Sequence, residues 1–211
     1  MTQESSMAAG APAPLDFVFA PDTTGLPGRS SAGWEARIVG LGAAFVRGTE
    51  IIGSTGSLVL QAKAHVDHPA AKKALEINGL RWEDIAAGSP ETLLAEQIKR
   101  QTRSDSTFWG YPISFTQHFL ARGPWFLIDG WGPCLMESAI RGVYRGEVKA
   151  PKRLALNVAL GWAMDKGHDV EAPFSGQRCE SQAIRIAKLL VALRKEGILP
   201  MVQPTTTASF G

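Results

Sequence analysis

The segment LDFVFAPDTTGL, Leu15–Leu26, decides the fold class of this chain. Its first six residues form a short apolar run rich in Phe and Val, which predicts a buried β-strand over 15–20. Asp22 and the Thr23-Thr24-Gly25 tripeptide follow directly, and residues of these types are typical of a turn after a strand. Such a strand and turn occur in many folds, so the rest of the chain has to show which fold contains them.

The remaining sequence predicts strands followed by alternating helices and strands. Strands are expected over 37–47, 58–65, 107–111 and 126–129, and helices over 69–76, 91–103, 116–122, 134–145, 153–166 and 181–196. The first three strands are joined by turns rich in Gly and Thr, which favours antiparallel pairing at the start. This order predicts an α/β fold, a mixed sheet with helices on its faces.

Four later stretches carry a more specific signal. They are HPAAKKALEINGL at 68–80, WGYPISFTQHFL at 109–120, WGPCLMESA at 131–139 and QRCESQAIRIAKLL at 177–190. Together with the opening segment, and in this order, they resemble the DnaQ-like (DEDDh) 3′–5′ exonucleases of the ribonuclease H-like superfamily. The resemblance runs from about Leu15 to about Leu199, and it implies a ribonuclease H-like mixed sheet, with a three-stranded antiparallel start and parallel strands, flanked by helices.

The same resemblance shows where the active site of the family would fall. The family carries an acid, any residue and a second acid before Thr-Thr-Gly, and these positions hold Ala20 and Asp22 here. A further acid, in the second motif of the family, corresponds to Thr116 in the 109–120 stretch. In the third motif, the 177–190 stretch, the general-base His corresponds to Gln177, and the last acid corresponds to Gln182. Asp22 is therefore the one carboxylate left among five family positions.

The chemistry of the family needs more than one carboxylate. Its members cleave phosphodiesters with two divalent metal ions, roughly 3.5–4 Å apart in sites of this kind, held by anionic oxygens. Ala20 has no ligand atom, and Gln177 does not accept a proton near neutral pH as a His would. We therefore predict a catalytically degenerate exonuclease-fold protein with no bound cofactor. Mg²⁺ or Mn²⁺ is expected only if residual nuclease activity exists, with Asp22 as its protein ligand.

An active enzyme with a rearranged site is the alternative. Asp22 would then have to converge with His168, Asp169 and Glu171, which precede the third motif. Glu180 is a poorer substitute, because two residues before Gln182 on a helix is about 200° around the axis. In this alternative the protein is an active divalent-metal-dependent 3′–5′ exonuclease. We rank it below a catalytically degenerate protein.

A protein that has lost catalysis could still bind nucleic acid. Basic residues gather near one predicted helix end and the loop after it, namely Arg141, Arg145, Lys149, Lys152 and Arg153, and such a group could contact phosphates. Alternatively these residues only solvate a helix face, which the small net charge of +2 favours. The expected partner is single-stranded DNA or RNA, or a protein complex in which the chain is a subunit. The oligomeric state stays open.

Length and composition indicate a soluble protein of one domain. The predicted division is an exonuclease-like domain over 15–199, with flexible tails over 1–14 and 200–211 that are rich in small and polar residues. No apolar run approaches the ~20 residues that a membrane helix requires. Cys134 and Cys179 are expected to be reduced and buried, which with the lack of a signal-peptide pattern predicts a cytoplasmic location.

Overall fold

The computed structural model describes residues 14–27, 34–147, 149–173 and 177–200. Apart from one residue each, the predicted tails over 1–14 and 200–211 lie outside these ranges. Along the described residues, no helix combines the length and the apolarity that crossing a bilayer needs.

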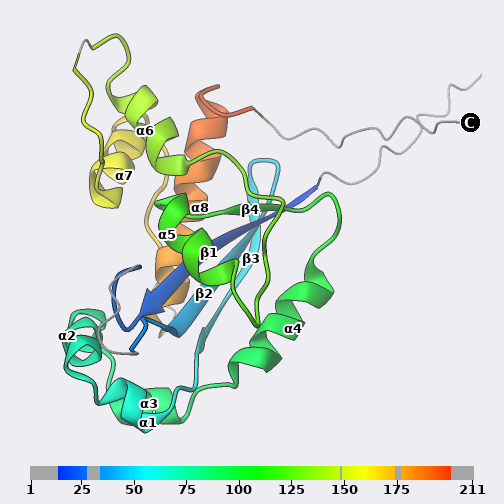
Figure 1. The fold of residues 1–211 in the computed structure, drawn as a ribbon. Helices are drawn as coiled ribbons and strands as arrows, with labels where there is room; N and C mark the ends of the chain where they lie inside the picture. The colour runs from blue at the N-terminus through cyan, green and yellow to red at the C-terminus, as the bar shows by residue number, and fades with distance from the viewer. Residues whose placement is uncertain (1–13, 28–33, 148, 174–176, 201–211) are drawn as a thin grey trace, which may run out of the picture.

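Within these ranges one four-stranded sheet forms, in the order β3-β2-β1-β4 (Figure 1). Its strands are β1 (Leu15–Thr23), β2 (Ile38–Arg47), β3 (Glu50–Leu58) and β4 (Thr107–Trp109). Strand β2 is antiparallel to both β1 and β3, and β4 runs parallel to β1. The predicted α/β class, a mixed sheet with an antiparallel start, is confirmed.

Helices cover both faces of the sheet (Figure 1). They are α1 (Lys63–Val66), α2 (Pro69–Asn78), α3 (Trp82–Ala86), α4 (Glu91–Gln101), α5 (Ile113–Leu120), α6 (Leu135–Val143), α7 (Leu156–Asp165) and α8 (Arg178–Lys195). Side chains alternate across a strand, so β1 serves two cores. Val18 and Ala20 pack with α6, α7 and α8, whereas Phe17 and Phe19 pack with α4 and α5.

Two of the predicted strands are wrong. The third strand is β3 at 50–58 and not 58–65, because a two-residue turn brings the chain straight back onto β2 with Arg47 opposite Glu50. Gly48 in that turn has φ 62°, a value that favours glycine in tight hairpins. No strand forms at 126–129 either: Phe126 has φ 51°, which an extended strand excludes, and only an isolated bridge joins Phe108 to Trp131.

Helix α8 is held against the glycine-lined face of the β2–β3 hairpin. Gly42 and Gly56 are direct cross-strand partners. A Cβ atom on Gly42 would lie 2.0 Å from the carbonyl oxygen of Cys179, and one on Gly56 would lie 2.7 Å from the Cβ of Glu180. Ser54 adds a hydrogen bond, donating from Oγ to Glu180 Oε1 at 2.7 Å. The two glycines therefore set how closely α8 can approach the sheet.

A buried ion pair fixes the other end of α8. Arg194 Nη1 donates to Asp16 Oδ2 at 2.7 Å and to the carbonyl oxygen of Gly48 at 2.8 Å. Trp109 Nε1 donates to the second oxygen of Asp16 at 2.8 Å. The ionic side chains are almost completely buried, at 3% exposure for Asp16 and 1% for Arg194. One carboxylate thus ties β1 to both β4 and α8.

The two cysteines are free thiols. Cys179 is buried and Cys134 is half-buried, so the prediction of two buried thiols is right for Cys179 and wrong for Cys134. Burial and the nearby charge of Asp22 raise the pKa of Cys179 to about 12. That thiol stays neutral at physiological pH and cannot act as a thiolate.

Candidate functional site

A cleft of about 370 Å³ opens at the C-terminal end of β1. It is lined by the end of β1 and the following turn, by α2, by α5 and by the first turns of α8: Ala20, Pro21, Asp22, Thr23, Gly25, Leu26, Ala74, Ile77, Asn78, Phe115, Arg178 and Gln182. Segments that lie far apart in the sequence therefore meet here. This is the place at which the opening segment and the 177–190 stretch were expected to converge.

Three of the five predicted active-site positions line this cleft, namely Ala20, Asp22 and Gln182. Thr116 does not line it. Its side chain is buried on α5 and packs against Gly110, so the preceding residue, Phe115, faces the cleft instead.

Gln177 is also outside the cleft lining. It is the residue immediately before α8, and its side chain lies against Gly56 of β3. Here too the neighbouring residue, Arg178, is the one that lines the cleft. At the position that the sequence resemblance assigns to the general base, this chain therefore has an amide that packs on the hairpin.

Arg178 forms an ion pair with Asp22. Its Nη1 lies 3.1 Å from Asp22 Oδ1, and the same nitrogen donates to Asn78 Oδ1. Asn78 in turn donates from Nδ2 to the carbonyl oxygen of Thr23 at 3.1 Å. This network ties β1, α2 and α8 together around the cleft. The side chain of Asp22 is only 12% exposed, whereas that of Arg178 is 50% exposed.

The pKa of Asp22 reflects these surroundings. Burial raises the pKa above the usual range of a carboxyl group, and the positive charge of Arg178 opposes that rise. The cation that compensates Asp22 is thus a side chain of the protein itself. Sequence reasoning did not single out Arg178; the available signal was a basic residue in the first turn of the helix that carries the third motif.

The described residues do not fit a two-metal centre. Nowhere in the described ranges do three His, Cys, Asp or Glu side chains come close enough to hold one ion. Within the cleft, Ala20 offers no ligand atom and Gln182 offers a neutral amide. Two divalent cations need several anionic oxygens, and Asp22 with its guanidinium partner supplies no such set.

The rearranged acid cluster is not assembled. His168 Nε2 lies 2.9 Å from Glu196 Oε1, and Asp169 Oδ2 lies 2.6 Å from Lys188 Nζ. Lys188 is ten residues further along α8 than Arg178, a separation of about 15 Å on a helix. His168 and Asp169 therefore lie beside the later turns of α8, whereas Asp22 lies beside its first turn. Glu180 bonds Ser54 and does not line the cleft, as its helical position predicted.

The predicted basic group does not border the cleft. Arg141, Arg145, Lys149, Lys152 and Arg153 are all exposed, at the end of α6 and in the connection to α7. In Figure 1 this connection lies at the opposite end of the molecule from α2, which forms one wall of the cleft.

The mouth of the cleft is apolar. Leu26 is 55% exposed and Ile77 is 68% exposed, although both are large hydrophobic residues. With Phe115 they place apolar surface beside the guanidinium of Arg178. The cleft therefore presents an ion pair, of which the cation is the more exposed member, and an apolar rim. This suits a ligand with an anionic group next to a flat apolar one.

No protein-family model and no curated protein matches the sequence. Solved structures match the fold. Exonuclease X in complex with 5′ overhanging duplex DNA is 18% identical, with a TM-score of 0.61 over 90% of this chain and 96% of that one. E. coli exonuclease I in complex with a 5cy-dT13 oligonucleotide is 14% identical, with a TM-score of 0.58 over 88% of this chain.

A moderately thermophilic exonuclease I from Methylocaldum szegediense is 16% identical, with a TM-score of 0.59 over 87% of this chain. This chain covers 41% of each of these two exonuclease I chains. Similarity at such low identity establishes the fold, and the chain has the exonuclease fold that the sequence predicted.

Proposed function

We propose that this protein is an exonuclease-fold protein that binds single-stranded nucleic acid in the cleft without hydrolysing it. The observation that carries the proposal is the ion pair between Asp22 and Arg178. It joins the one acid left at the family positions to a guanidinium, so the cleft holds a fixed protein cation beside its one family carboxylate. Such a cleft attracts phosphate more readily than it binds Mg²⁺.

The binding half of the proposal rests on Arg178 and the apolar rim. A guanidinium has five N–H donors in a fixed fork and suits phosphate oxygens. Half of this side chain is exposed, so donors remain accessible beyond those used by Asp22 and Asn78. Exposed Leu26 and Ile77 offer surface for the faces of bases. The neighbours of this fold that were solved with DNA, exonuclease X and exonuclease I, support the same ligand class.

The proposal that the protein does not hydrolyse nucleic acid rests on the side chains that are available to bind metal ions. The chemistry expected of the fold needs metal ions to activate water and stabilise the leaving oxygen. The residues at the family positions are alanine, a paired aspartate, a buried threonine and two glutamines. We therefore assign no hydrolytic step to this cleft.

Replacing Arg178 by Ala is expected to weaken the binding of a labelled oligo-dT roughly tenfold or more, because a hydrogen bond to a charged group contributes about 1.5–3 kcal/mol. The slope of log K against log salt should also fall by about one. Fluorescence anisotropy across a salt series measures both. Arg153→Ala, in the α6–α7 connection, is the matched control and should change the affinity less. Loss of binding in the control with no change in Arg178→Ala would move the interface to the basic group.

We expect no trimming of labelled single-stranded DNA or RNA with Mg²⁺ or Mn²⁺. Denaturing gels over a long incubation measure this, and an Asp22→Ala variant is run beside the parent protein. Metal-dependent trimming that disappears in Asp22→Ala would replace the proposal with an active exonuclease. An absence of any oligonucleotide binding would instead favour a protein-binding subunit.

A further inference from the structure

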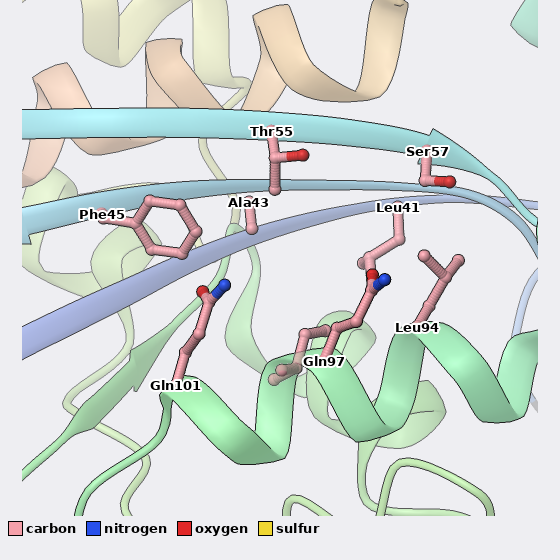
Figure 2. Close-up of a pocket in the computed structure, with 9 residues that line it drawn as sticks. Leu41, Ala43, Phe45, Thr55, Ser57, Leu94, Gln97 and Gln101 are labelled. Carbon is pink, nitrogen blue, oxygen red and sulfur yellow. The ribbon is translucent and has the colours of Figure 1, made fainter.

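A second cavity, of about 340 Å³, lies between α4 and the sheet, on the face opposite α8 (Figure 2). Its floor is formed by Leu41, Ala43 and Phe45, which alternate along β2 and so share one face of the sheet. Leu94 and Ile98 of α4 form the facing wall. None of the residues that line this cavity lines the cleft at the end of β1.

The register of the hairpin explains why this space is not filled. Phe45, Ala43 and Leu41 are paired with Gly53, Thr55 and Ser57 in turn. The β3 half of this face therefore carries only small side chains. Leu94 of α4 shares a hydrophobic core with Phe17 and Phe19 of β1. The cavity remains beside Ala43 and the small residues of β3.

One side of the cavity is polar but uncharged. Thr55 and Ser57 contribute hydroxyl groups from β3, while Gln97 and Gln101, one helical turn apart, contribute amides from α4. Figure 2 shows both glutamine side chains rising from the helix toward the sheet. No Asp, Glu, Lys, Arg or His is among the residues that line the cavity.

We propose that this cavity binds an uncharged planar heterocycle of the nucleobase type. A primary amide places an acceptor beside a donor, and it pairs bidentately with a ring edge that carries the complementary pair. Phe45 and the aliphatic floor suit the flat faces of such a ring. A phosphate would meet no cation among the residues that line the cavity. The volume lies at the lower end of the range for small-molecule sites, roughly 300–1,000 Å³.

The test uses adenine, adenosine, uridine and nicotinamide as probes, with AMP as the charged comparison. Saturable binding of at least one neutral probe is expected by isothermal titration and ligand-observed NMR, with AMP weaker than adenosine. Gln97→Leu should weaken that binding roughly tenfold, since it removes the bidentate pair. Ala43→Phe, which fills the cavity, should abolish it. Gln117→Leu on α5, outside the cavity, is the matched control and should leave it unchanged.

Three results would overturn this site: no neutral probe binds, binding survives in both cavity variants, or binding is lost in Arg178→Ala. Gln97 is exposed, so Gln97→Leu decides the matter alone if Ala43→Phe does not fold. Oligo-dT binding measured on the same variants should be unaffected, which keeps the fate of this site separate from that of the cleft.

Discussion

Arg194→Met is expected to lower the free energy of unfolding by about 3–5 kcal/mol, because it leaves the carboxylate of Asp16 buried without its cation. Among the described residues, the carboxylate of Asp16 would keep only the hydrogen bond from Trp109. Chemical denaturation followed by tryptophan fluorescence measures the loss. Lys195→Met changes the next residue of the same helix, which is exposed, and should alter stability by less than about 0.5 kcal/mol.

A double variant separates the cost of leaving one charge buried without a partner from the cost of losing the whole ion pair. In Arg194→Met with Asp16→Asn, no buried charge remains and an amide oxygen can still accept from Trp109. Most of the loss in the single variant should therefore be recovered. The Nε and Nη2 atoms of Arg194 are buried without a hydrogen-bond partner among the described residues, which further favours an apolar replacement. A double variant as unstable as the single one would show that the guanidinium acts mainly through packing.

Gly42→Ala is expected to lower the free energy of unfolding by about 3 kcal/mol, at the upper end of the usual cost of overpacking. The new Cβ would lie 2.0 Å from a backbone oxygen, that of Cys179, which cannot move aside as the end of a flexible side chain would. The start of α8 must shift, and with it the contact between Arg178 and Asp22. Oligo-dT affinity should therefore fall together with stability.

Gly161→Ala is the control for this substitution. Gly161 lies inside α7, and nothing lies within 4 Å of a Cβ built there. The change should stabilise the helix by roughly 0.5–1 kcal/mol, since glycine weakens a helix interior. Equal effects of the two substitutions would show that the approach of α8 to the hairpin is looser than the structure indicates.

The sequence predicted those helices and strands whose hydrophobic periodicity and residue composition indicate the same type of element. The apolar run of β1 and the pattern of α8 were found, with ends shifted by a few residues. Strand β3 was missed because Gly53, Ser54, Thr55, Gly56 and Ser57 carry little hydrophobic signal. Its position is instead set by the tight turn at Gly48, a local effect that apolar alternation does not report.

The candidate site could be predicted only in part. Ala20, Asp22 and Gln182 line one cleft. Thr116 and Gln177 lie one residue away from the side chains that line the cleft, a rotation that a motif alignment cannot detect. The role of Arg178 depends on its distance to Asp22, and that distance exists only once α8 is packed on the sheet.

The glycine-lined hairpin also has a consequence for how the chain is made. Ser54 meets Glu180 across 126 residues, and Asp16 meets Arg194 across 178. During synthesis, the sheet face that α8 covers stays exposed on β1, β2 and β3 until α8 has left the ribosomal exit tunnel. Contacts this distant in sequence fold slowly, so the nascent hairpin is the segment that we expect to need a chaperone.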